Sequence, residues 1–194
     1  MPDISLQCRC GAVKGAAKNI TPRNGNHLVC CCSDCQRFAH YLDENNAHHI
    51  VDEFGGTRIY QTSQSQVSIS QGSEHVRCLR LTPKGLYRWY TECCNTPIGN
   101  TMNAKMAFVG LIHNFIAIPD NPQISLGPIL GFVQTNDAVA QPDYPATSEK
   151  VPLRLLLRII RKLLVWKMRG MGQPSCFFDT KGKATVKPIV LNRN

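Results

Sequence analysis

The sequence predicts a mainly β protein that carries a basic amphipathic helix near its C-terminus. Up to about residue 115, the 194-residue chain is a series of short strand-like runs separated by turns rich in glycine and proline. The runs follow one another at intervals of roughly 8–12 residues, a spacing typical of antiparallel sheets. The clearest of them cover residues 57–61, 66–70, 75–81, 86–90 and 108–113.

Two segments have the pattern of helices. The first, residues 33–42, has Ser33 or Asp34 in position to act as its N-cap. The second, residues 153–169, follows Pro152 and ends just before Gly170, and these two residue types favour the beginning and the end of a helix.

The helix predicted over 153–169 has two different sides. The basic side carries Arg154, Arg158, Arg161, Lys162 and Arg169. The apolar side carries Leu153, Leu156, Ile160, Leu163, Leu164 and Met168, and it is widened by Leu155, Ile159 and Trp166. We expect the apolar side to dock on the β domain or on a second subunit. The alternatives are contact with an anionic membrane surface and, less favoured, contact with nucleic acid.

The charge of the chain is concentrated in its last part. Residues 151–194 carry ten Lys and Arg against the single acid Asp179, whereas residues 1–150 carry equal numbers of basic and acidic residues. The net charge of +9 is therefore a property of the C-terminal part and does not indicate that the main domain binds nucleic acid. We expect no nucleic acid partner.

These patterns divide the chain into four parts. Residues 1–118 form the β domain, and residues 119–150, which are rich in proline, form an irregular connection. Residues 151–170 form the basic helix. Residues 171–194 form a final segment in which a strand over 184–191 could rejoin the β domain.

The chain lacks a secretory signal pattern and any run of ~18 apolar residues. We therefore expect a cytoplasmic protein, with peripheral attachment to a membrane through the helix as an open alternative. Thiols stay reduced in the cytosol, where clustered cysteines usually bind metal or take part in catalysis.

Seven of the ten cysteines fall into motifs. Cys8 and Cys10 form a Cys-x-Cys-Gly motif, Cys30, Cys32 and Cys35 form Cys-x-Cys-x-x-Cys, and Cys93 and Cys94 are adjacent. Zinc thiolate sites need sulfurs that converge from tight turns, and a site with only three protein ligands leaves a position for water or substrate. We therefore predict a closed zinc site from Cys8, Cys10, Cys93 and Cys94, and an open one from Cys30, Cys32 and Cys35. An inert or disulfide-forming triplet is the alternative, and Cys78 and Cys176 are expected to be buried apolar residues.

In this order the motifs resemble those of the glutathione-dependent formaldehyde-activating enzyme and centromere protein V family, over about residues 6–113. The resemblance implies a β-tent of coiled antiparallel sheets that holds two zinc ions. One zinc is structural and is bound by the first and last cysteine pairs. The other is bound by the central triplet and is associated with the addition of glutathione to formaldehyde, which gives S-(hydroxymethyl)glutathione.

The last pair departs from the family's aromatic-Cys-x-x-Cys-Gly-Thr-Pro pattern. Here Cys94 is in register with the second cysteine of that pattern, but Thr91 stands where the first would be. Cys93 could substitute from the adjacent position. The structural site could instead be distorted, completed by another ligand, or lost.

With the open zinc site, this resemblance implies a zinc-dependent, carbon–sulfur lyase-like protein that acts on adducts of glutathione, or another small thiol, with formaldehyde or a small aldehyde. Cys30, Cys32 and Cys35 would be its catalytic residues, and Arg37, two positions after Cys35, would bind a substrate carboxylate. The alternative is a non-catalytic, zinc-stabilised binding module that residues 153–169 direct to a membrane surface or a protein partner.

Overall fold

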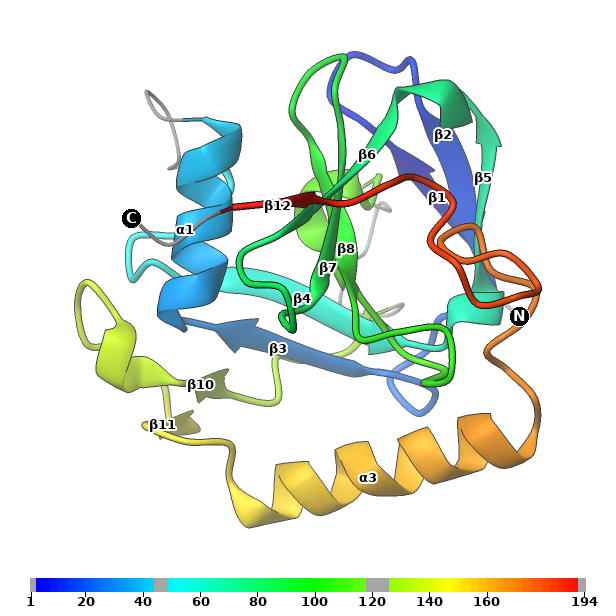
Figure 1. Ribbon diagram of the computed structural model, residues 1–194. Coiled ribbons are helices and arrows are strands. Elements are labelled where there is room, and N and C mark those ends of the chain that lie inside the picture. Colours follow the sequence, from blue (N-terminus) through cyan, green and yellow to red (C-terminus); the bar gives the residue numbers. More distant parts are fainter. Residues whose placement is uncertain (1–2, 44–48, 118–125, 192–194) are drawn as a thin grey trace.

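The computed structural model describes residues 3–43, 49–117 and 126–191 and shows the expected mainly β fold (Figure 1). A small antiparallel sheet has the order β1-β2-β5, with bounds Ile4–Gln7, Lys14–Ala17 and Val67–Gln71. A large sheet has the order β11-β10-β3-β4-β9-β8-β7-β6-β12. In that order its strands are Thr147–Ser148, Phe132–Val133, Asn26–Cys30, Thr57–Thr62, Val109–Ile112, Pro97–Thr101, Tyr87–Thr91, Val76–Arg80 and Ile189–Val190.

Two α-helices, α1 (Ser33–Leu42) and α3 (Leu153–Met168), accompany the sheets. Short 3-10 turns at Gln64–Gln66, Ser73–His75, His113–Phe115 and Thr135–Asp137 complete the described elements. Among the described residues no helix is long and apolar enough to cross a membrane.

The five strand-like runs singled out in the sequence correspond to β4, β5, β6, β7 and β9, and each agrees within one residue at either end. These strands pair with antiparallel neighbours, as their spacing predicts. The connection expected to be irregular contributes the short strands β10 and β11, which extend the large sheet by parallel pairing beyond β3. The final segment does rejoin the sheet, but its strand β12 is limited to Ile189–Val190, which pairs in parallel with β6.

The main core is built around Trp89 of β7. Its ring lies 5.1 Å from that of Phe177 and 5.8 Å from that of Phe178, and its indole N–H donates to Thr101 Oγ1 at 2.9 Å. Phe177 and Phe178 are buried although they come from the C-terminal segment. The residues that follow α3 are therefore an integral part of the β core.

The beginning of α1 differs from the prediction that Ser33 or Asp34 caps it. Cys32 is the N-cap residue and makes no side-chain capping bond. The Ser33 N–H instead donates to the Asp137 carboxylate at 2.8 Å, from a turn more than 100 residues later in the chain. This distant cap leaves the Asp34 side chain free to face another partner.

The helix α3 docks on the β domain through only one edge of the predicted apolar side. Leu155 and Trp166 are buried, whereas most of the predicted apolar side is exposed. The docking side also includes two basic residues. Arg158 donates to Asn26 Oδ1 and to the carbonyl oxygens of Pro22 and Gly25, and Lys162 donates to that of Arg23. The expectation of docking on the β domain thus holds only for one edge of the apolar side, because these carbonyl groups attract the cationic edge.

The substitution Trp166→Ala is expected to lower the free energy of unfolding by about 3 kcal/mol, because it removes a large buried side chain. Leu164→Ala, on the exposed side of the same helix, is the matched control and should change it by less than about 0.5 kcal/mol. Urea denaturation of both variants measures the difference. Equal effects would contradict the docking described here.

Candidate metal centres

Two groups of cysteine sulfurs converge among the described residues. One comprises Cys8, Cys10, Cys93 and Cys94, and the other comprises Cys30, Cys32 and Cys35. Within each group all the sulfur atoms lie within 4.8 Å of one another. These are the two groups that the motif spacing predicts, and either could hold a metal ion.

The four-cysteine group has the dimensions of a tetrahedral thiolate site. Its sulfurs are separated by 3.6 Å (Cys8 to Cys10), 3.9 Å (Cys8 to Cys93), 3.4 Å (Cys10 to Cys93) and 3.9 Å (Cys93 to Cys94). A tetrahedral zinc ion with Zn–S bonds of ~2.3 Å requires sulfurs about 3.8 Å apart. The donor set therefore fits zinc with little rearrangement.

Two hairpin turns bring these sulfurs together. Cys8 and Cys10 lie between β1 and β2, and Cys93 and Cys94 lie between β7 and β8. The backbone N–H of Arg9 donates to Thr96 Oγ1 at 3.0 Å, and its guanidinium donates to the Cys94 carbonyl at 3.2 Å, so the two turns are tied to each other.

The adjacent pair Cys93-Cys94 supplies two sulfurs to this group. Asn95 next to it has φ +53°, a left-handed conformation that asparagine tolerates better than most residues, and it turns the chain back into β8. Of the outcomes left open by the altered motif, the structure thus shows convergence of all four sulfurs.

Thr91 supports this group although it cannot ligate through sulfur. The Cys94 sulfur lies 3.5 Å from Thr91 Oγ1 and 3.1 Å from Thr96 Oγ1. Burial raises the pKa of the Cys94 thiol, but hydrogen bonds from these hydroxyls and from Cys10 outweigh it and lower that pKa to about 6. Thr91, which stands where the formaldehyde-activating enzyme family has a cysteine, therefore stabilises the neighbouring thiolate of Cys94.

The three-cysteine group lies at the junction of β3 and α1. Cys30 ends β3, Cys32 is the N-cap of α1, and Cys35 is in the first turn of that helix. Among the described residues no fourth Cys, His, Asp or Glu joins them. Hydrogen bonds from Cys30 and Cys35 lower the pKa of Cys32 well below its ordinary value, and the nearby charge of Arg88 acts in the same direction. Without metal the group thus favours a thiolate at Cys32, the form that binds metal, while the pKa values of the Cys30 and Cys35 thiols are raised.

Cys31 lies within the same motif but does not belong to the group. It is fully buried in a separate apolar cluster with Val29 and Phe132. Burial raises the pKa of its thiol to about 12, so Cys31 behaves as an apolar core residue.

A buried arginine that the sequence analysis did not identify lies beside the triplet. Arg88 of β7 is 2% exposed, and its Nη1 lies 4.0 Å from Cys35 Sγ. Its Nη2 donates to Asp34 at 3.4 Å, and its buried Nε has no partner among the described residues. The sequence could have indicated Arg88, because it is a charged residue within the aromatic run Tyr87–Tyr90, and a charge is seldom buried without an electrostatic partner.

The triplet also has an apolar wall. Cys35 packs in one cluster with Leu28, Ile59 and Val133, and α3 adds Leu155 and Ile159 to it. Sequence spacing could not place α3 here, because its docking depends on contacts with residues more than 100 positions earlier.

Arg37, the predicted carboxylate-binding residue, is exposed on α1. No hydrogen bond or ion pair within the described part of the chain connects its side chain to the cysteines. Its role in binding glutathione remains a prediction.

We expect two zinc ions per chain under reducing conditions, counted by native mass spectrometry. Cys32→Ser and Cys94→Ser should each lose one ion, because each removes a sulfur from a different group. Cys31→Ala is the matched control for the triplet and should retain both. A chain that binds no zinc, or that forms disulfides instead, would contradict both sites.

Arg88→Met is expected to weaken zinc binding at the triplet by about 10- to 100-fold, because it removes the cation beside the thiolates. Competition against a chromophoric chelator measures this affinity. Arg80→Met is the control, since Arg80 is also partly buried but donates to the Gly85 carbonyl instead. Equal affinity in the two variants would show that Arg88 has no electrostatic role at the site.

Comparisons with known proteins give a family but no established activity. No curated protein matches this sequence. A crystal structure of a Rhodobacter sphaeroides protein is similar in part, at 16% identity and a TM-score of 0.45, over 65% of this chain and 97% of that one. The model of one family, described as a family of unknown function (DUF6151), matches residues 2–189. This chain therefore belongs to the DUF6151 family.

Proposed function

We propose that this protein is a zinc-dependent, carbon–sulfur lyase-like protein that acts on adducts of a small thiol, such as glutathione, with formaldehyde or another small aldehyde. The observation that carries the proposal is the convergence of only three sulfurs, from Cys30, Cys32 and Cys35, in a setting that has a buried cation and an apolar wall. The motif resemblance to the formaldehyde-activating enzyme family supports the same chemistry.

The proposed reaction needs no oxidant or reductant. In one direction the thiol sulfur bonds to the aldehyde carbon, the carbon–oxygen π bond opens, and the thiol proton ends on oxygen as a hydroxyl. The reverse reaction breaks the same carbon–sulfur bond. When bound at the triplet, a zinc ion would supply Lewis acidity and lower the pKa of a thiol.

The protein's own residues contribute in two ways. A divalent ion bound by three thiolates forms a complex with a net charge of −1, which weakens the Lewis acidity of the ion. The guanidinium of Arg88 offsets this negative charge. Arg88 is itself buried and the wall that contains Leu28, Ile59 and Leu155 is apolar, so the electrostatic effect of Arg88 is stronger than it would be in bulk solvent.

Exchange between ¹³C-labelled formaldehyde and its glutathione adduct, followed by NMR exchange spectroscopy, tests the proposal. We expect zinc-loaded protein to accelerate the exchange above its spontaneous rate. Cys32→Ala should return it to that rate, and Cys31→Ala should leave the acceleration unchanged. If zinc-loaded protein gives no acceleration, the lyase proposal fails and a non-catalytic zinc-stabilised binding module becomes the better description.

A further inference from the structure

The outer side of α3 exposes a continuous apolar stripe. Six aliphatic side chains, each 40–78% exposed, form the stripe: Leu153, Leu156, Leu157, Ile160, Leu164 and Met168. They run along the whole of this 16-residue helix, a length of about 24 Å. Figure 1 shows α3 along one outer side of the molecule, so no other described element covers the stripe. Contiguous apolar patches of this kind usually mark a surface that binds a partner or a membrane.

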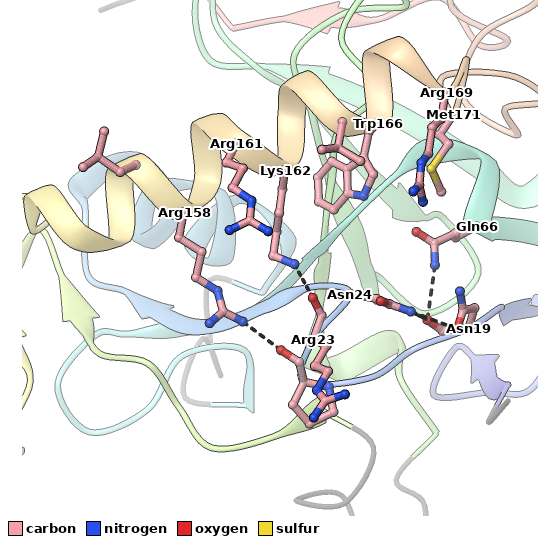
Figure 2. A pocket seen from close by; sticks show the side chains of 13 residues that line it. Asn19, Arg23, Asn24, Gln66, Arg158, Arg161, Lys162, Trp166, Arg169 and Met171 are labelled. Carbon is pink, nitrogen blue, oxygen red and sulfur yellow. Dashed lines mark hydrogen bonds between the residues drawn. The ribbon is translucent and has the colours of Figure 1, made fainter.

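A cationic cleft of about 680 Å³ lies between α3 and the segment before β3. Its lining includes five basic residues, Arg23, Arg158, Arg161, Lys162 and Arg169, and no Asp or Glu. Figure 2 shows Arg161 and Lys162 extending from α3 toward the segment that carries Arg23 and Asn24. Leu157 belongs both to the cleft and to the stripe, so the two features are continuous.

Three of these cations are available to a ligand. Arg158 and Lys162 already donate to oxygens of the segment before β3 and of Asn26 at the start of β3. The side chains of Arg23, Arg161 and Arg169 make no hydrogen bond or ion pair within the described ranges. Burial, and to a smaller extent the neighbouring Arg158 and Arg161, lowers the pKa of Lys162 to about 8. Guanidinium groups are well suited to bind phosphate oxygens.

We propose that α3 attaches the protein to a membrane surface rich in anionic phospholipids. The apolar stripe enters the boundary between headgroups and acyl chains, and lipid phosphates bind along the cleft to the guanidinium groups of Arg23, Arg161 and Arg169. The stripe thus matches the acyl chains of a phospholipid and the adjoining cleft matches its phosphate, as in helices that lie in the plane of a membrane.

The distribution of charge favours a membrane over a second copy of the chain. No acidic residue occurs between Glu149 and Asp179, so two copies that paired through their stripes would bring basic edges together. An anionic lipid surface would instead attract the same edges. The attachment would also leave the cysteine triplet uncovered, because α3 contacts that cluster through Leu155 and Ile159 on its opposite side.

Sedimentation with vesicles tests the apolar half of the proposal. The full chain is expected to bind vesicles that contain phosphatidylglycerol and to bind pure phosphatidylcholine vesicles at least tenfold more weakly. The double variant Ile160→Asp/Leu164→Asp should lose at least tenfold in binding to the anionic vesicles. Val139→Asp is the matched control, because Val139 is 74% exposed but lies outside the stripe, and it should bind as the parent does.

The basic half is tested with Arg161→Gln/Arg169→Gln. Each cation near an anionic surface increases partitioning roughly fivefold, so the double variant should bind about 25-fold more weakly. Lys105→Gln, an exposed lysine outside α3 and outside the lining of the cleft, is the control and should have little effect. Raised salt should weaken binding by the parent chain, because it screens the lipid charge.

Three results would overturn the proposal. Equal binding to neutral and anionic vesicles would exclude recognition of anionic lipid. Binding of free inorganic phosphate to the cleft without vesicle binding would identify a site for a small soluble anion. A concentration-dependent dimer in sedimentation velocity, lost in Ile160→Asp/Leu164→Asp while no vesicle binding occurs, would show that a second copy covers the stripe. None of these results bears on the lyase proposal, whose variants lie at the cysteine triplet.

Discussion

The architecture of this protein depends on one geometric constraint: seven thiols from distant parts of the chain must meet in two small groups. Four of them require the β1–β2 and β7–β8 turns to face each other, although these turns are more than 80 residues apart in sequence. The other three fix the junction at which β3 passes into α1. Sulfurs held about 3.8 Å apart suit a tetrahedral metal ion, whereas free thiolates at that distance would repel one another. Metal binding and folding are therefore expected to be coupled in this chain.

The two groups differ in their surroundings, and the difference explains why we assign chemistry to one of them. In the four-cysteine group, all four positions of a tetrahedron are supplied by the protein, and hydroxyl groups of Thr91 and Thr96 support the thiolate of Cys94. The triplet supplies three positions and lies against a buried guanidinium. A buried arginine is costly unless negative charge is close, so Arg88 and the thiolates stabilise each other. This mutual dependence connects β7 at the centre of the core to the site at the end of β3.

Local patterns were sufficient to predict much of this arrangement. Strand spacing located five strands of the described sheets, and motif spacing identified both cysteine groups. Local patterns could not predict contacts between distant segments. The cap of α1 comes from Asp137, the cation beside the triplet comes from Arg88, and the wall of the triplet includes Leu155 of α3. The docking side of α3 was predicted only in part for a related reason: carbonyl oxygens of the segment before β3 attract Arg158 and Lys162, which a hydrophobic pattern assigns to solvent.

We expect the chain to hold one metal ion with four protein sulfurs and one with three. Zinc K-edge X-ray absorption of the two-zinc protein tests it most directly, because it counts sulfur neighbours. The two sites should give an average of about 3.5 sulfurs per zinc at ~2.3 Å, the remainder being a light atom, and the average should rise toward about four when glutathione is added. An average of about four that does not change with glutathione would contradict the account, because both sites would then be closed.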